Sequence, residues 1–246
     1  MRNFKLVLAY DGSRYKGWQR LGDTDHTIQG KLESVLSRMV NAPVEVIGSG
    51  RTDAGTHAAG QVANVHIHTD MNAQAICDYL RQYLPEDIGV RSVEEVDDRF
   101  HSRFHALQKT YVYRIWTSDH PCVFERKYVL SVAAQFDLSA MKKAAAHFLG
   151  SHDFTAFCSN KRFKKSAVRT IYQLEIKETE HELQFWVTGD GFLYNMVRIM
   201  VGTLISVGRG ELSPDQIPFI LESKQRELAG ETVPAKGLCL MEVQYP

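Results

Sequence analysis

The chain has 246 residues, of which 44% are hydrophobic and 24% are charged, values typical of a globular protein and unlike those of a disordered or fibrous one. Lysine and arginine together number 29, as do aspartate and glutamate, so the formal net charge is zero. This balance excludes binding of nucleic acid through bulk charge alone, although local basic patches could still bind it.

The sequence also bears on compartment. The longest apolar-rich stretch, 192–207, is interrupted by polar residues and falls short of the roughly 18 apolar residues that a membrane span needs. The first residues lack the features of a signal peptide. Four cysteines lie far apart without a Cys-x-x-Cys pair, which argues against a zinc ribbon or a disulfide framework. We therefore expect a cytoplasmic protein with no membrane partner and with reduced core cysteines.

The predicted elements of the first half follow from apolar periodicity and from helix-capping and helix-breaking residues. A strand at 4–10 is ended by Asp11-Gly12-Ser13, and a helix at 28–40 has Thr27 as its N-cap. Further along we predict a short strand at 44–47, a strand at 61–67, a helix at 73–84 that stops before Pro85, and a strand at 88–96. The loop 48–57 therefore joins two predicted strands.

In the second half, residues 109–117 alternate as in a strand, with Tyr111, Tyr113 and Ile115 on one face. We then predict a helix at 138–149 capped by Asp137, a hairpin at 170–177 and 183–188, a buried helix at 192–207, a short helix at 214–222 and a strand at 238–243. Strands in runs with interspersed helices favour an α+β fold with a largely antiparallel sheet. A domain boundary near Phe104 would give domains 1–104 and 105–246.

The loop Gly48–His57 carries the residues best suited to chemistry. Its glycines indicate a shaped loop, and its spacing fits neither a Rossmann fingerprint nor a P-loop. Arg51 lies two residues before Asp53; beside a permanent cation the pKa of a carboxyl falls, which would leave an ionised nucleophile or base. A salt-bridged surface turn is an equal alternative. A metal site formed by Asp53 and His57, with the further candidates His66 and His68, is a third alternative.

Cationic residues elsewhere suggest a partner. Arg198 lies in an otherwise apolar helix, and a buried guanidinium needs a carboxylate or phosphate, so it could reach toward Asp53. A basic run occupies residues 161–165. Residues 97–105 mix aromatics with cations, a composition that suits RNA bases and phosphates; a linker is an equal alternative for this segment. Most such runs are simply solvated surface.

The loop Gly48–His57 resembles the catalytic motif of the TruA-type tRNA pseudouridine synthases. Further blocks resemble the family in the same order: Tyr10-Asp11-Gly12-Ser13 with Gly17-Trp18-Gln19, Phe100-His101-Ser102-Arg103-Phe104, Lys109-Thr110-Tyr111-Val112-Tyr113-Arg114, Asn195-Met196-Val197-Arg198 with Val201-Gly202, and Pro234-Ala235 with Gly237-Leu238. The similarity thus spans almost the whole chain. It departs from the family at Thr56, where valine is usual, and at 81–85.

The resemblance implies a pseudouridine synthase fold of two α+β subdomains, with a largely antiparallel mixed sheet flanked by helices and a central RNA-binding cleft. It implies an RNA-modifying isomerase without cofactor or metal, acting as a homodimer on uridines 38, 39 and 40 of the tRNA anticodon stem-loop. Asp53 would be the nucleophile, attacking either C1′ of the ribose or C6 of the uracil. Tyr111 would stack on the flipped uracil, Arg51 would fill its place in the stem or hold the nearby backbone, and Arg198 would pair with Asp53.

Candidate RNA contacts lie in or beside some of the matching blocks and in the basic run: Arg14, Lys16, Trp18, Gln19, Arg103, Lys109, Lys161, Arg162, Lys164 and Lys165. Because the departures from the family leave the target open, the same chemistry on another tRNA position or on ribosomal RNA is an alternative. A non-catalytic RNA-binding relative is a second alternative, and a metal-dependent phosphohydrolase built on Asp53 and His57 is a third.

Overall fold

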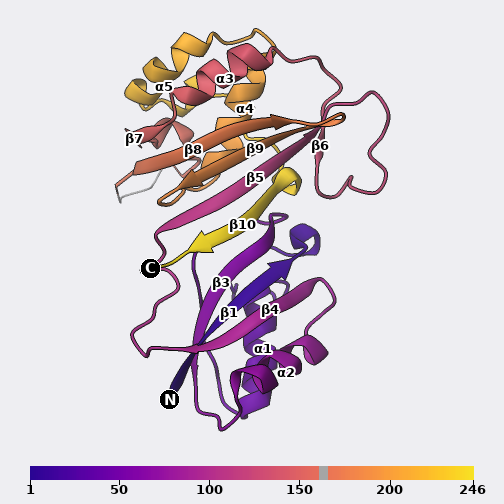
Figure 1. The fold of residues 1–246 in the computed structure, drawn as a ribbon, viewed down its shortest axis with the longest axis vertical. Helices are drawn as coiled ribbons and strands as arrows, with labels where there is room; N and C mark the ends of the chain where they lie inside the picture. The colour runs from indigo at the N-terminus through magenta and orange to yellow at the C-terminus, as the bar shows by residue number, and fades with distance from the viewer. Residues whose placement is uncertain (161–165) are drawn as a thin grey trace. The chain divides into compact units, whose positions relative to one another are not determined.

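The computed structural model describes residues 1–160 and 166–246, and the chain forms two compact units (Figure 1). Unit 1 comprises Met1–Leu107 together with Cys239–Pro246, and unit 2 comprises Gln108–Leu238. The C-terminal strand therefore belongs with the first part of the chain.

Unit 1 is built on a sheet in the order β4-β1-β3-β10, with β2 also paired to β3. Its strands are β1 (Arg2–Tyr10), β2 (Val46–Gly48), β3 (His57–Ile67), β4 (Ile88–Val96) and β10 (Leu238–Gln244). Strand β1 runs antiparallel to β3 and β4, whereas β10 runs parallel to β3. Arg2 lies opposite Ile67 and Tyr10 opposite Ala58. The end of β1 thus lies beside the start of β3, where the loop 48–57 finishes.

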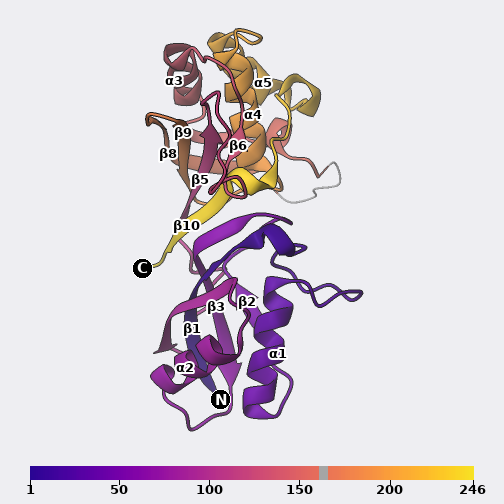
Figure 2. The same cartoon turned by 90° about the vertical axis from the view of Figure 1, so that its right-hand side faces the viewer.

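Two helices of unit 1, α1 (Ile28–Val40) and α2 (Ala73–Tyr83), pack side by side (Figure 2). Thr27 caps α1 by accepting a hydrogen bond from the backbone of Gly30, and Asn72 caps α2 in the same way. Each helix buries a stripe at a spacing of four residues: Ile28, Leu32 and Leu36 in α1, and Ile76 and Leu80 in α2. Burying each such side chain contributes about 1.5–3 kcal/mol.

The sheet of unit 2 has the order β5-β9-β8-β7, and β6 pairs parallel with β5. Its strands are β5 (Gln108–Trp116), β6 (Leu130–Ser131), β7 (Gly150–Asp153), β8 (Val168–Glu178) and β9 (Glu182–Gly189). The pairs β5–β9, β9–β8 and β8–β7 are antiparallel. The predicted hairpin of β8 and β9 is confirmed, and Tyr111, Tyr113 and Ile115, which were predicted to share one face of a strand, are buried in β5.

Helices α3 (Leu138–Ala146), α4 (Met196–Gly208) and α5 (Ile217–Ser223) lie together beside this sheet (Figure 1). The described residues also include short 3-10 helices: η1 (Gly12–Arg14), η2 (Thr155–Phe157), η3 (Pro214–Gln216), η4 (Arg226–Leu228) and η5 (Ala235–Gly237). Every residue of α4 is buried except Arg198 and Ser206, as expected for the centre of a core. The α+β class with a largely antiparallel sheet is thus confirmed.

One boundary was wrong in each of two predicted helices. The helix expected at 138–149 ends at Ala146, and the chain enters β7 at Gly150, whose φ of 92° favours glycine. The helix expected from Phe192 begins only at Met196, because Asn195 takes the left-handed conformation with φ 63°. Within the described residues, no helix combines the length and apolar character needed to cross a membrane.

Candidate active site

The loop Gly48–His57 joins the end of β2 to the start of β3 in unit 1. Asp53 is half-buried at its centre, and the carbonyl oxygen of Asp53 accepts a hydrogen bond from the backbone N–H of Thr56 at 3.0 Å. Gly55 completes this turn with a φ of 78°, a conformation that L side chains rarely adopt. The turn thus fixes the backbone on the C-terminal side of Asp53.

Arg51 is exposed, and it forms no hydrogen bond or ion pair with any residue that the structure describes. The salt-bridged turn that the sequence allowed is therefore not the arrangement found for Arg51. Its guanidinium keeps its full donor capacity, and a planar guanidinium suits phosphate and base recognition. Asp53, by contrast, has interacting neighbours.

Two glycines of the segment after β1 are needed by the backbone of the loop. A Cβ atom on Gly12 would lie 2.0 Å from the carbonyl oxygen of Thr56, and one on Gly17 would lie 2.6 Å from that of Thr52. Gly17 also has a φ of 96°. At Gly12 and Gly17, the backbone of the segment after β1 thus packs directly against the backbone of the loop Gly48–His57, on either side of Asp53. A side chain at either position would displace the loop.

Trp18, one of the expected RNA contacts, is only 2% exposed. Its backbone N–H donates to the carbonyl oxygen of Thr52 at 3.0 Å, and its ring lies against Gly48, where a Cβ atom would come within 2.5 Å of the indole. Gly48 therefore makes room for Trp18. The indole supports the loop from inside unit 1 and has little surface left for RNA.

Buried polar side chains hold the loop from β1 and β3. The Tyr10 hydroxyl lies 2.8 Å from Oγ1 of Thr52, and the Gln61 amide bonds both the Ser49 hydroxyl at 2.6 Å and the carbonyl oxygen of Gly50 at 3.1 Å. Sequence reasoning missed these supports. A signal was present, since Gln61 is a large polar residue between small and apolar residues, Ala58 to Gly60 before it and Val62 and Ala63 after it.

His57 lies buried at the start of β3. Its Nδ1 accepts a hydrogen bond from the backbone N–H of Gly12 at 3.1 Å and lies 3.2 Å from Oδ1 of Asp11. The imidazole thus braces the turn η1. Nε2 of His66 lies 3.2 Å from the carbonyl oxygen of Asp98. Among residues 1–160 and 166–246, no three His, Cys, Asp or Glu side chains gather as metal ligands do.

In unit 2, Tyr111 on β5 is 8% exposed, and the edge of its ring faces Phe192 with the centroids 5.2 Å apart. Edge-to-face packing of this kind fixes the plane of a ring. Arg198, in the first turn of α4, is half-buried; its Nε donates to the carbonyl oxygen of Val233 at 2.7 Å, and its Nη1 to Oδ1 of Asn195 at 2.8 Å. These two neutral oxygens help to orient the guanidinium. The sequence did not predict that Val233 and Asn195 would contact Arg198.

The remaining expected RNA contacts differ in exposure. Arg14, Lys16 and Arg103 are exposed, and Arg14 forms a long ion pair with Asp87 at 3.7 Å. Gln19 and Lys109 are half-buried. Four others, Lys161, Arg162, Lys164 and Lys165, lie outside the described residues.

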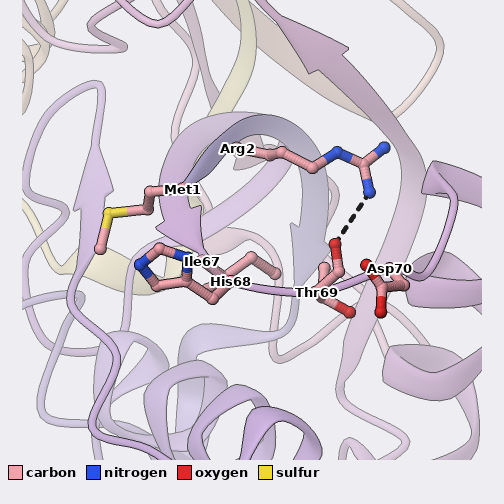
Figure 3. Close-up of a pocket in the computed structure, with 6 residues that line it drawn as sticks. All are labelled: Met1, Arg2, Ile67, His68, Thr69 and Asp70. Atoms are coloured by element: carbon pink, nitrogen blue, oxygen red, sulfur yellow. Dashed lines mark hydrogen bonds between the residues drawn. The ribbon is translucent and has the colours of Figure 1, made fainter.

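A separate pocket of about 330 Å³ opens at the other end of unit 1 (Figure 3). It is lined by Met1, Arg2, Ile67, His68, Thr69 and Asp70. Arg2 is already engaged, since it donates to the carbonyl oxygens of Thr69 and Met71 and to the carboxylate of Glu95. Arg2 begins β1, and Tyr10, beside the loop Gly48–His57, ends it. The length of β1 therefore puts the pocket roughly 25 Å from that loop. It is distinct from the candidate site.

Comparison with known proteins identifies the family. The model of a family described as tRNA pseudouridine synthase matches residues 6–105 and 144–246. The chain is 52% identical to "tRNA pseudouridine synthase A" of Bacillus sp. (strain KSM-64) and 50% identical to "tRNA pseudouridine synthase A 2" of Bacillus cereus (strain ZK / E33L). It is 42% identical to "tRNA pseudouridine synthase A" of Acetivibrio thermocellus. Each match extends over 245 residues and covers 100% of both chains.

Among solved structures, the chain is similar to one in "Crystal Structure of a Cbf5-Nop10-Gar1 Complex", with 13% identity, a TM-score of 0.37, and coverage of 82% of this chain and 45% of that chain. The family match and the full-length relatives are far more specific. The chain therefore belongs to the tRNA pseudouridine synthase family, and it is an isomerase of pseudouridine synthase fold that acts on tRNA.

Proposed function

We propose that this chain converts uridine to pseudouridine at positions 38, 39 and 40 of the tRNA anticodon stem-loop, with Asp53 as the nucleophile. The observation that carries the proposal is the placement of Asp53, half-buried on a loop whose backbone is held on both sides. The exposed Arg51 lies two residues away. Membership of the family supplies the reaction, and the loop supplies the reacting group.

The chemistry needs only a nucleophile and a base. The bond from uracil N1 to ribose C1′ breaks, the uracil turns over, and a bond from C5 to C1′ forms. C5 loses its proton and N1 gains one, so the reaction is redox-neutral and needs neither metal nor cofactor. Attack of the Asp53 carboxylate on C1′ and attack on C6 both satisfy this balance.

A uridine inside a stem must leave the stack before a carboxylate can reach it, which costs a few kcal/mol. We propose that Arg51 enters the space that the base leaves, because its guanidinium is exposed and unpaired among the described residues. Tyr111, whose ring is fixed against Phe192, stacks on the flipped uracil. Arg198 supplies the cation that pairs with the carboxylate of Asp53, as the family resemblance implies.

RNA recognition would rest on local contacts, since the net charge is zero. The exposed cations Arg14, Lys16 and Arg103 suit contact with phosphates, and tRNA would be accepted by shape more than by sequence. We further propose that the protein acts as a homodimer in the cytoplasm. Sedimentation of the purified protein, whose chain has a mass of 27.9 kDa, tests the dimer directly.

The target is tested by mapping pseudouridines in RNA from a strain that lacks the gene and has no redundant enzyme. We expect positions 38, 39 and 40 to lose the modification and to regain it when the purified protein is added. Persistence of all three would overturn the assignment. Loss at another tRNA position or in ribosomal RNA would favour the same chemistry on a different target. Binding of tRNA without product by the wild-type protein would favour a non-catalytic relative.

A further inference from the structure

The supports of the Asp53 loop inside unit 1 form a connected set of buried hydrogen bonds. Gln61 on β3 is fully buried and Tyr10 at the end of β1 is 5% exposed. The Gln61 amide nitrogen donates to the carbonyl oxygen of Gly50 at 3.1 Å and to the Tyr10 hydroxyl at 3.4 Å. The Tyr10 hydroxyl in turn lies 2.8 Å from Oγ1 of Thr52.

The other end of the Gln61 amide extends this set. Its oxygen accepts from the Ser49 hydroxyl at 2.6 Å and from the backbone N–H of Val62 at 3.1 Å. Two side chains of the sheet therefore bond three of the four residues that directly precede Asp53, namely Ser49, Gly50 and Thr52. Arg51, the fourth, is exposed. Ser49, Gly50 and Thr52 are thus held by the sheet, whereas the side chain of Arg51 is accessible to RNA.

Each hydrogen bond between the side chains of Gln61, Tyr10 and Thr52 can have one donor and one acceptor. Burial raises the pKa of Tyr10, so its hydroxyl remains protonated. Because that hydroxyl accepts from the Gln61 amide, its own proton is available for Thr52. Removal of either side chain would leave buried polar atoms of the loop unsatisfied, and each such atom costs about 1–3 kcal/mol. The loop would relax to recover these bonds.

We propose that Gln61 and Tyr10 are positioning residues that set the place of the Asp53 carboxylate, an inference that rests on the proposed role of Asp53 as nucleophile. Neither residue needs to touch the RNA. A catalytic group held within about half an ångström reacts far faster than one that moves, whereas RNA affinity depends on contacts elsewhere. Loss of these bonds should therefore lower kcat and leave KM nearly unchanged.

The test is steady-state kinetics of Tyr10→Phe and Gln61→Met, which keep side-chain volume and remove the hydrogen bonds. We expect kcat to fall by about tenfold or more and KM for tRNA to change by less than about threefold. Ser37→Ala is the matched control: it removes a hydroxyl of unit 1 that accepts from the backbone N–H of Val44 at 3.0 Å. It should lower the melting temperature and leave kcat unchanged.

If Tyr10→Phe does not fold, Thr52→Val tests the same hydrogen bond. This substitution removes the Thr52 hydroxyl that bonds Tyr10, with little change in side-chain shape. Thr52→Ser, which keeps the hydroxyl, should restore most of kcat. In the double variant of Tyr10→Phe and Thr52→Val, kcat should be no lower than in the slower single variant, since both remove the same bond. Folded variants with wild-type kcat would overturn the positioning role. So would variants in which KM for tRNA rises while kcat stays at the wild-type value.

Asp53→Asn is measured in parallel, so that the two failures can be told apart. If Asp53→Asn is active, the proposed nucleophile is wrong, whatever the other variants do. If Asp53→Asn is inactive while folded variants of Gln61 and Tyr10 turn over normally, only the positioning role is wrong. Circular dichroism of every variant shows that it is folded under the assay conditions.

Discussion

Gly17→Ala should impair both stability and catalysis, because the new methyl group would meet the backbone beside Asp53. With a φ of 96°, Gly17 has a conformation that costs an alanine about 1–2 kcal/mol. The added Cβ would also lie 2.6 Å from the carbonyl oxygen of Thr52, about 0.8 Å short of ordinary contact at 3.4 Å. That oxygen accepts the hydrogen bond of Trp18, worth about 1 kcal/mol.

We therefore expect Gly17→Ala to lower the free energy of unfolding by about 2–3 kcal/mol. A displacement of this size next to Asp53, the proposed nucleophile, should lower kcat on the order of 100-fold. Gly210→Ala is the matched control, because Gly210 has a φ of 74° with no atom within 4 Å of its added Cβ. It has the same type of backbone strain, without the clash.

The assays are urea denaturation for stability and tritium release from tRNA labelled at uracil C5 for turnover, since C5 loses its hydrogen in the reaction. Gly210→Ala should lose about 1–2 kcal/mol and keep its kcat. If Gly17→Ala matches Gly210→Ala in both assays, the close approach of Gly17 does not position the loop.

Three further results are expected. Burial disfavours the ionised carboxyl of Glu182, but hydrogen bonds from Arg114 and Gln184, together with the charge of Arg114, outweigh burial and hold its pKa below the ordinary 4.5. This stability is present above the unfolded pKa and is lost as pH falls, so the wild type should lose its advantage over Glu182→Gln in urea titrations below about pH 4.5. A constant difference would contradict the pairing. The affinity for tRNA should fall steeply between low and physiological salt as counterions are released, whereas a flat dependence would argue against phosphate contacts by Arg14 and Lys16. Turnover should persist in EDTA, and chelator inhibition would favour the metal-dependent alternative built on Asp53 and His57.

The helices of unit 1 could be predicted because their signals are local. Apolar spacing, the cap Thr27 and the helix-breaking Pro85 predict α1 and α2 to within a residue or two. Strand β4 was predicted at its observed bounds. In each case the residues that decide the structure lie within the element itself.

The misplaced boundaries depend on distant partners or on single residues. Strand β3 begins at His57, before the predicted 61, because β10 pairs there with Cys239 opposite His57. The small residues Ala58, Ala59 and Gly60 carry no strand pattern of their own. The start of α4 depends on one left-handed residue, Asn195, which apolar periodicity does not reveal.

The candidate site divides in the same way. Glycine spacing and charge indicate the loop and the kinds of chemistry open to Asp53, and similarity to the family ranks them. The sequence did not show that Trp18 lies inside, that Gly48 makes room for it, or that Arg51 is left without an ion pair in the described part of the chain. These facts depend on which neighbours the folded chain brings together.

The nucleophilic role of Asp53 is tested most directly by single-turnover pseudouridine formation with Asp53→Asn, a change that keeps shape and removes the charge. Asp53 is half-buried, so the folded structure should tolerate the amide. We predict that no pseudouridine forms while tRNA binds with an affinity close to that of the wild type. Product formation at the wild-type rate would contradict the account and remove Asp53 from the reaction.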